Sequence, residues 1–316
     1  MRTFRRVLIT GASGSAGSYM ADYIFDDQPG VAVHGLSRWH QNRKLDNRVI
    51  WHECDLLDLS SIMRALRASQ PDAIIHLASH ANVRTGFDTP LAVLHNNIMG
   101  TANLFEAVRG TEGNPLILMC STSEVYGQVS PDNIPITEAC PINPSSPYAV
   151  SKAAQDMLAQ TYFKAYGLDI IVTRMFTYIN PRRDDLFASA FAKQIVAIER
   201  GTQSELRHGN LSSIRTIIDV RDAMRAYWSI LELGQIGEIY NIAGLWEVTV
   251  GVFMEHLIMQ SGVEVPCRLD GSLLRPFDVT MQIVNCEKFV ARTGWKPKYS
   301  LDDSVSMLLG YWRNHA

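Results

Sequence analysis

The sequence VLITGASGSAG, from Val7 to Gly17, decides the fold of this chain. Its first four residues predict a short buried strand, and a helical pattern follows from Tyr19 to Phe25. Between them, a glycine-rich turn of spacing G-x-x-G-x-x-G lets the backbone approach a pyrophosphate at the positive end of the helix. We therefore predict a dinucleotide-binding turn made of Gly11, Ser13, Gly14, Ser15, Ala16 and Gly17.

Apolar runs and helical patterns alternate from this turn as far as Phe176. The further predicted strands are Val31 to Leu36, Val49 to Glu53, Ala73 to Leu77, Leu116 to Cys120 and Ile170 to Phe176. This alternation predicts an α/β fold with a Rossmann-type doubly wound parallel sheet, and ligands at the carboxyl ends of its strands. After Phe176 the pattern loosens, and we expect a smaller, discontinuous α/β lid that binds the substrate. The predicted cofactor domain spans 1–176 and about 216–244, and the predicted substrate domain spans 177–215 and 245–316.

The residues that follow the second and third strands indicate which dinucleotide is bound. An NAD site prefers an acidic residue at the end of the second strand, where this chain has Arg38. A planar guanidinium suits a 2′-phosphate, so Arg38 favours NADP, with NAD as the weaker alternative. Asp55, after the third strand, is a candidate acceptor for the adenine amino group.

Two further segments carry groups that can move protons. CSTSEVYG (Cys120 to Gly127) ends the fifth predicted strand, and SPYAVSK (Ser146 to Lys152) starts a helix capped by Ser146. In that helix Tyr148 and Lys152 are four residues apart, on one face. A tyrosine and a lysine at this spacing are also common on ordinary surface helices, so the pair needs further support.

The size of the electrostatic interaction supports a functional pairing of Tyr148 with Lys152. Lowering a phenol pKa from about 10 to near 7 needs about 4 kcal/mol. One unit charge about 4 Å away, at an effective dielectric near 20, supplies roughly that amount. We therefore predict that Tyr148 and Lys152, facing the hydroxyls and the carboxylate at the end of the fifth strand, move protons at a sugar carbon.

Composition excludes several other classes of protein. The 316 residues are 47% apolar and 19% charged, with a formal net charge of -3, so neither nucleic acid nor an anionic membrane is expected as a partner. No segment reaches the roughly 18–20 apolar residues of a membrane span. The five cysteines form no C-x-x-C pair and the nine histidines show no metal-binding spacing, so we expect no metal. Reduced thiols indicate the cytoplasm.

Together these motifs resemble those of the extended short-chain dehydrogenase/reductases that act on nucleotide sugars, along nearly the whole chain. The matching segments, in order, are Gly11 to Gly17, Asp55-Leu56, His76-Leu-Ala78, Asn97-Ile-Met-Gly-Thr101, Ser121-Thr-Ser-Glu-Val-Tyr-Gly127 and Tyr148-Ala-Val-Ser-Lys152. The resemblance implies that Leu56, Leu77 and Ala78 join the cofactor site, and that Tyr148 and Lys152 contact the cofactor as well. It also implies NADP and a homodimer or homotetramer.

Within that family the chain is most similar to GDP-mannose 4,6-dehydratases. The residues that carry this similarity are Val33-His-Gly-Leu-Ser-Arg38, Asn180-Pro-Arg-Arg183, Gly209-Asn-Leu211 followed by Arg215, and Leu274-Arg-Pro276. The similarity implies that the catalytic residues are Thr122, Glu124, Tyr148 and Lys152. It also implies a GDP-linked sugar whose diphosphate meets Lys193, Arg215 and Arg275. The remaining candidate substrate-binding residues are Ser123, Thr177, Asn180 and Arg182.

The chain also departs from the dehydratase pattern. Thr177-Tyr178 replaces the usual Asn-His, and Arg215-Thr216-Ile217 replaces Arg-Asp-Trp or Arg-Asp-Phe. A short loop after Arg38, and Asp219-Val-Arg-Asp222, are similar to the neighbouring GDP-4-keto-6-deoxymannose reductases. We therefore expect a 4,6-dehydratase, with a 4-reductase or 4-epimerase of the same family as the alternative. A non-catalytic NADP(H)-binding sensor or scaffold is the alternative from another class.

Overall fold

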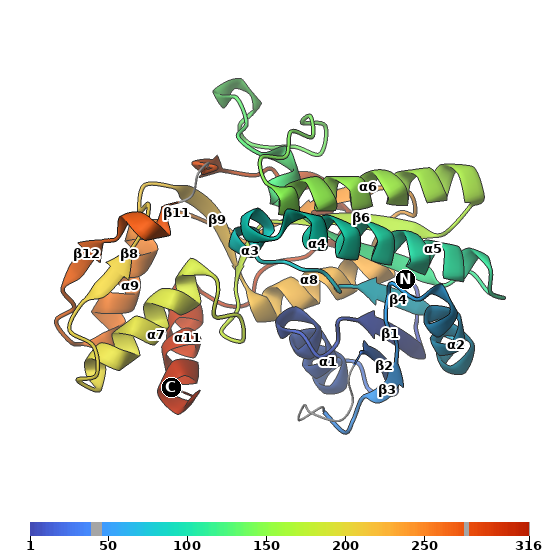
Figure 1. Cartoon of the computed structure of the whole chain (residues 1–316), viewed down its shortest axis with the longest axis horizontal. Coiled ribbons are helices and arrows are strands. Elements are labelled where there is room, and N and C mark those ends of the chain that lie inside the picture. Colours follow the sequence, from blue (N-terminus) through green and yellow to red (C-terminus); the bar gives the residue numbers. More distant parts are fainter. Residues whose placement is uncertain (39–45, 275–277, 316) are drawn as a thin grey trace.

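A seven-stranded parallel sheet forms the larger part of the protein (Figure 1). The computed structural model describes residues 1–38, 46–274 and 278–315. In spatial order the strands of this sheet are β10 (Ile239–Ile242), β6 (Ile170–Met175), β5 (Leu116–Thr122), β4 (Ala73–His76), β1 (Arg6–Thr10), β2 (Ala32–Ser37) and β3 (Ile50–Glu53). Every neighbouring pair in this order is parallel. The predicted doubly wound Rossmann-type sheet is confirmed.

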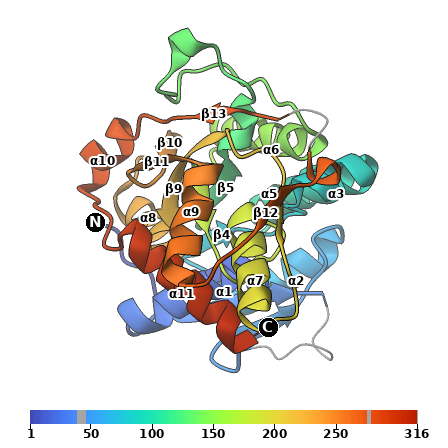
Figure 2. The ribbon, with the colours of Figure 1, turned by 90° about the vertical axis from the view of Figure 1, so that its left-hand side faces the viewer.

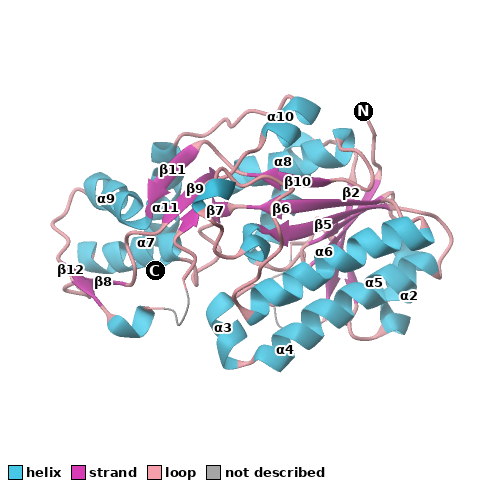
Figure 3. Cartoon of the chain, turned by 90° about the horizontal axis from the view of Figure 1, so that it is seen from above, coloured by secondary structure: helices cyan, strands magenta, loops and turns pink. Residues whose placement is uncertain are grey.

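Helices cover both faces of this sheet, as Figure 3 shows from above. On one face α2, α5 and α6 pack over a core that includes Leu8, Ile74 and Phe105. On the other face α1, α8 and α10 pack over a core that includes Ile9, Met20 and Trp228. The helices of this part are α1 (Ser15–Asp27), α2 (Leu59–Ser69), α3 (Val83–Asp88), α4 (Pro90–Leu94), the π-turn η1 (His95–Met99), α5 (Gly100–Arg109), α6 (Pro147–Tyr166), α8 (Val220–Leu233) and α10 (Glu287–Thr293).

The direction of winding reverses between β1 and β4, which are neighbours in the sheet. In open α/β sheets the ligand crevice lies at such a point, outside the carboxyl ends of the strands. The glycine turn leaves β1 at this position. Gly11 has a φ of +73°, and a Cβ there would lie 2.9 Å from the Cα of Ala78. A Cβ at Gly17 would lie only 2.2 Å from the Gly11 carbonyl oxygen, so α1 approaches the turn as closely as a glycine allows.

The smaller part is built around β9, from segments that are far apart in the sequence. β11 pairs antiparallel with β9, while β7 and β13 pair with opposite ends of β9 in the parallel sense. Figure 2 shows α7, α9 and α11 gathered on this side, and they enclose a separate apolar core. The elements of this part are β7 (Thr177–Ile179), α7 (Phe187–Glu199), β8 (Leu206–His208), β9 (Ile214–Asp219), β11 (Trp246–Thr249), α9 (Val250–Ser261), β12 (Cys267–Leu269), β13 (Met281–Gln282) and α11 (Leu301–His315).

The domain boundaries that the sequence predicts stay a prediction. Phe289 and Trp295 pack into the core of the large sheet together with α8. Their packing argues for assigning the segment around α10 to the cofactor side, although it lies within the range 245–316. Among the helices of the described residues, none is long and apolar enough to cross a membrane.

Candidate active site

One continuous cavity of about 860 Å³ joins the glycine turn to the smaller part of the protein. It passes over the carboxyl ends of β4, β5 and β6 and reaches β8 and β9. The predicted residues that line it are Gly11, Gly14, Ser15, Ala16, Gly17, Leu77, Thr122, Ser123, Glu124, Tyr148, Lys152, Thr177 and Arg215. The four predicted catalytic residues therefore share one cavity with the predicted dinucleotide turn.

Helix α6 presents Tyr148 and Lys152 to this cavity. Ser146 caps the helix, because its side-chain oxygen accepts a hydrogen bond of 3.1 Å from the Ala149 N–H. Burial raises the pKa of Tyr148 to about 12 and lowers the pKa of Lys152 to about 8. The Lys152 ammonium donates a 2.7 Å hydrogen bond to the Cys120 carbonyl oxygen, at the end of β5.

Arg183 is a cation that acts on Tyr148. After burial, the charge of Arg183 is the largest influence on the Tyr148 pKa, and it lowers that pKa. Arg183 lines the cavity and is held by Asp185, at 2.7 Å, and by the Ala81 carbonyl oxygen, at 2.6 Å. The sequence argument gave this role to Lys152. The pair Arg182-Arg183 is visible in the sequence, but two adjacent arginines do not reveal which one faces a cavity.

Tyr178 lies beside Arg183 on the same wall. Burial raises the pKa of Tyr178, while the charge of Arg183 and a hydrogen bond with it act in the opposite direction. This tyrosine occupies the position where the dehydratase pattern has histidine. A second phenol therefore lines the cavity close to Tyr148. Arg183 interacts electrostatically with both tyrosines.

Glu124 reaches the cavity from η2 (Ser123–Tyr126), a short 3-10 helix that follows β5. The hydroxyl of Thr122 accepts a 3.3 Å hydrogen bond from the Glu124 N–H and so caps this turn. The Glu124 carboxylate accepts a 3.4 Å hydrogen bond from the Gln282 side-chain amide, on β13. After burial, the charge of Glu124 is among the groups that raise the Tyr148 pKa, so the carboxylate acts on the phenol. Gln282 was not predicted, because it lies 158 residues from Glu124.

Other predicted cofactor residues lie near the carboxyl edge of the sheet without lining the cavity. Ala78 packs against Gly11, and Arg38 directly follows β2. The Asp55 carboxylate accepts a 3.0 Å hydrogen bond from the Leu57 N–H. Ser13 and Leu56 likewise do not belong to the lining among the described residues. Their cofactor roles stay predictions.

The predicted substrate-binding residues divide into two groups. Thr177, Ser123 and Arg215 line the cavity. The structure does not bring Arg182, Lys193 and Asn180 there. Arg182 pairs with Asp22 of α1 at 2.8 Å, and the Lys193 ammonium lies 5.3 Å from the ring centroid of Trp312.

Asn180 is buried, and its side chain accepts a 2.9 Å hydrogen bond from the Arg182 N–H. Arg275 lies outside the described residues. The substrate-binding role of these residues therefore stays a prediction as well.

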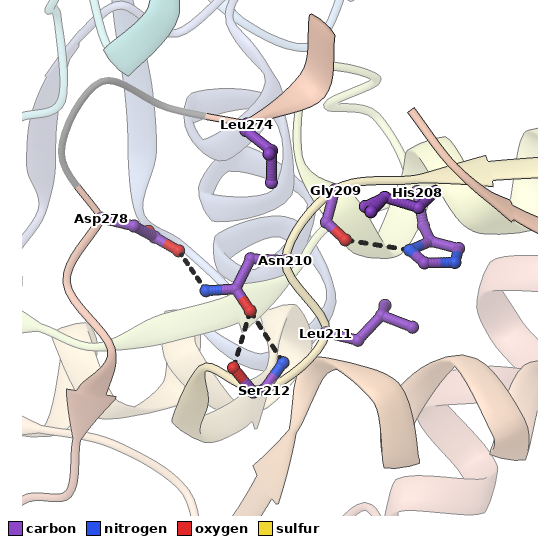
Figure 4. Close-up of a pocket in the computed structure, with 8 residues that line it drawn as sticks. His208, Gly209, Asn210, Leu211, Ser212, Leu274 and Asp278 are labelled. Atoms are coloured by element: carbon purple, nitrogen blue, oxygen red, sulfur yellow. Dashed lines mark hydrogen bonds between the residues drawn. The ribbon is translucent and has the colours of Figure 1, made fainter. Parts of the chain in front are cut away.

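A second, more open hollow of about 580 Å³ adjoins the cavity and shares residues with it (Figure 4). Asp278 accepts hydrogen bonds of 2.9 Å from Asn210 and from Ser213. Arg215 lies 3.7 Å from the same carboxylate. The structure thus adds His208, Asn210, Ser213 and Asp278 to the polar residues of this end. In the described ranges, no group of three or more His, Cys, Asp or Glu side chains is arranged to hold a metal ion.

Comparison with known proteins assigns the family. The profile of the family described as GDP-mannose 4,6 dehydratase matches residues 8–308. The chain belongs to the GDP-mannose 4,6-dehydratase family. The predicted resemblance to enzymes that act on nucleotide sugars is confirmed.

Proteins that are similar to this chain include two kinds of enzyme. GDP-6-deoxy-D-mannose reductase of Pseudomonas aeruginosa is 30% identical over 312 residues, which cover 98% of each chain. GDP-mannose 4,6-dehydratase of Yersinia enterocolitica is 27% identical over 350 aligned residues, which cover 96% of this chain and 93% of that one.

Two solved structures extend the comparison to cofactors. RMD from Pseudomonas aeruginosa, complexed with NADPH, has a TM-score of 0.87 and 29% identity, and the match covers 99% of this chain and 100% of that chain. DesIV, a dTDP-glucose 4,6-dehydratase from Streptomyces venezuelae with NAD and TYD bound, has a TM-score of 0.85 and 25% identity over 98% and 97% of the two chains. The family and the fold are therefore established, while the two structures carry different dinucleotides.

Proposed function

We propose that this protein is an NADP-dependent nucleotide-sugar 4,6-dehydratase that converts a GDP-hexose such as GDP-mannose into a 4-keto-6-deoxy sugar. One observation carries the proposal: the Glu124 carboxylate lines the same cavity as Thr122 and Tyr148, and its charge acts on the phenol. A 4,6-dehydratase needs a group that removes the proton at C5, in addition to one that acts at the C4 hydroxyl. Glu124 is the carboxylate that fits this second task.

The residues around the glycine turn fit a dinucleotide. The absence of side chains at Gly11 and Gly17 lets the turn, Ala78 and α1 approach one another closely. Gly14, Ser15 and Ala16 would hold the pyrophosphate at the start of α1, since they line the cavity there. The bound nicotinamide dinucleotide would supply the hydride acceptor for C4 and the hydride donor for C6.

The side chains of this protein supply the proton transfers. Tyr148 takes the proton of the C4 hydroxyl, and Thr122 hydrogen-bonds the same oxygen. The C4 ketone acidifies the neighbouring C5–H bond, and Glu124 removes that proton. Protonated Glu124 then assists the loss of water from C6.

The second candidate function is a 4-ketoreductase of the same family, and two observations favour it. Burial raises the pKa of Tyr148 to about 12, which keeps it a neutral phenol suited to protonating a ketone oxygen. A reductase is also among the similar proteins. In that reaction Glu124 would only be a polar wall of the cavity.

One experiment distinguishes the two functions. The protein is incubated with GDP-, UDP-, dTDP- and CDP-sugars plus NADP⁺, and products are analysed by mass spectrometry. A dehydratase gives a loss of 18 daltons without net cofactor change. A reductase gives no such loss, but consumes NADPH stoichiometrically with a 4-keto-6-deoxy sugar. Binding of NADPH without conversion of any sugar would instead favour the sensor or scaffold.

Three further properties belong to the same proposal. Arg38 supports NADP over NAD, and a cytoplasmic location follows from the cysteine content. A homodimer or homotetramer is supported by exposed apolar side chains on α4, η1 and α6, which are Leu91, Met99, Val150 and Met157. Equilibrium titration with both dinucleotides and sedimentation analysis test the cofactor and the assembly.

A further inference from the structure

Beneath the active site, six buried polar residues form a continuous chain of hydrogen bonds, through their side chains and the backbone carbonyl oxygen of Asn97. It begins at Thr10, directly before Gly11, and ends at the backbone carbonyl of Tyr148. All six are at most 1% exposed, and none of them belongs to the cavity lining among the described residues. We call them the buried polar chain, and its members are Thr10, His76, Thr101, Gln155, Asn97 and Ser151.

The first half of the buried polar chain has only one arrangement of protons. The Thr101 hydroxyl donates to the Asn97 carbonyl oxygen at 2.8 Å, so it must accept from His76 Nε2–H, also at 2.8 Å. His76 Nδ1 is then an acceptor, and the Thr10 hydroxyl donates to it at 2.7 Å. Thr10 in turn accepts a 3.1 Å hydrogen bond from the Ala78 N–H, beside the glycine turn.

The second half of the buried polar chain connects η1 to α6, the helix that carries Tyr148. The Gln155 amide donates to both the Thr101 hydroxyl and the Asn97 carbonyl oxygen. The Asn97 amide donates to the Ser151 hydroxyl at 2.9 Å, and Ser151 donates to the Tyr148 carbonyl oxygen at 2.7 Å. Asn97 lies within η1, and π-turns inside helices are frequent at functional sites.

This arrangement ties β1, β4, η1, α5 and α6 together in a fixed register. Apolar contacts are non-directional and tolerate small displacements, whereas a buried hydrogen bond is lost when its partners separate, at the cost of an unpaired polar group. Burial, together with a smaller effect of the nearby charge of Lys152, lowers the pKa of His76 to about 3. The imidazole therefore stays neutral at physiological pH and the hydrogen-bond pattern does not reverse.

We propose that the buried polar chain holds the phenol of Tyr148 in place relative to the glycine turn, with His76 fixed as the neutral Nε2–H tautomer and Thr10 and Thr101 as positioning residues. The kinetic consequence rests on the proposed function. A displacement of about 1 Å at the reacting atoms can reduce a rate about 100-fold.

The test compares Thr101→Val with Thr101→Ser. Valine keeps the shape of threonine without the hydroxyl, while serine keeps the hydroxyl. We expect Thr101→Val to lower kcat by about tenfold or more, with a dissociation constant for NADP(H) within about twofold of the unaltered protein. Thr101→Ser should restore kcat to within about threefold. Both variants are assayed well below their unfolding temperatures. Equal values of kcat in the two variants would overturn the proposal.

Two spectroscopic measurements need no substrate. In ¹⁵N spectra, His76 should show a protonated Nε2 and an unprotonated Nδ1 from pH 5 to pH 9, with its signal assigned by His76→Gln. In spectra of ¹³C-tyrosine protein, Thr101→Val should move the Tyr148 resonance and Thr101→Ser should not. The other tautomer, a protonated imidazole, or a Tyr148 resonance that neither variant moves would contradict the inference. Failure of every sugar to react would instead count against the proposed function alone.

Discussion

At the scale of single residues, the cavity brings the phenol of Tyr148 under the influence of one guanidinium and one carboxylate. Arg183 and Glu124 act on the Tyr148 pKa in opposite directions, and burial outweighs both. Lys152, which the sequence pairs with Tyr148, directs its ammonium to the end of β5. The acidity of Tyr148 therefore depends on a residue that the Tyr–Lys motif does not contain.

Arg183→Gln should move the pH profile of the reaction. Removing the guanidinium removes an effect that lowers the Tyr148 pKa, so the pKa rises and less phenolate is present at a given pH. A dehydratase, which needs the phenolate, should lose up to about tenfold in kcat/KM at pH 8, because one unit of pKa changes the phenolate fraction tenfold. A reductase, which needs the phenol, should keep its rate to higher pH. The profile is measured from pH 6 to pH 10.

Arg182→Gln is the matched control for this change. It removes the same charge one residue away, but Arg182 contacts Ser18 and Asp22 on α1. Its pH profile should keep the inflection of the unaltered protein, whatever its rate. An equal displacement of the profile in both variants would show that the effect is not specific to Arg183.

Glu124→Gln should separate oxidation at C4 from the elimination of water in a dehydratase reaction. The variant keeps a polar side chain of the same length beside Gln282, but it cannot take a proton from C5. Loss of a general base typically costs about 100-fold to 10,000-fold in rate. We expect the 18-dalton loss to disappear, while oxidation at C4 persists as absorbance of reduced dinucleotide up to one equivalent per enzyme. Equal loss of both signals would argue against Glu124 as the base.

At the scale of elements, the large sheet was predictable and the small sheet was not. Strands β5 and β6 of the large sheet are buried and rich in apolar residues, and Ser146-Pro147 predicts the start of α6, so local sequence contains the signal. β7, β11 and β13 are only two to four residues long, and each is stabilised by pairing with β9 across a long stretch of sequence. Local patterns contain no such information. For the same reason Gln282 and Asp278 could not be assigned to the site.

Gly17→Ala tests the close packing of the glycine turn. A Cβ at this position would lie 2.2 Å from the Gly11 carbonyl oxygen, so α1 or the turn must move. We expect the dissociation constant for NADP(H) to rise about 100-fold or more, which corresponds to about 2.7 kcal/mol. Fluorescence titration measures this change.

The control is Gly310→Ala, in the middle of α11, where a Cβ would meet nothing within 4 Å. It should raise the free energy of unfolding by about 0.5–1 kcal/mol and leave cofactor affinity unchanged. Unchanged affinity in Gly17→Ala would show that the turn has room that the structure does not indicate.

At the scale of the whole molecule, the buried ammonium of Lys152 links folding to pH. Its pKa is lowered from 10.5 to about 8, because burial disfavours the charged form. Below about pH 8 the Lys152 amine is protonated in both the folded and the unfolded states. The folded state then bears the full free-energy cost of burying the charged ammonium. Between about pH 8 and pH 10.5 the folded state binds fewer protons than the unfolded state, so the contribution of Lys152 to stability rises with pH.

Lys152→Met isolates this contribution. The free energy of unfolding of the variant should exceed that of the unaltered protein most at pH 7, and the difference should shrink by about 2 kcal/mol between pH 7 and pH 9.5. Urea denaturation at several pH values measures it. Lys164→Met, at an exposed position of the same helix, is the matched control. A constant difference for Lys152→Met would mean that the amine is solvated in the folded protein.

The assembly of the small sheet around β9 also has a consequence for biosynthesis. All seven strands of the large sheet, together with the glycine turn, have left the ribosome once Ile242 emerges. β13, which delivers the hydrogen-bond donor to Glu124, is translated later. Nascent chains fold from the amino terminus onward. We therefore expect a stalled chain that ends shortly after β10 to bind the dinucleotide but not the sugar.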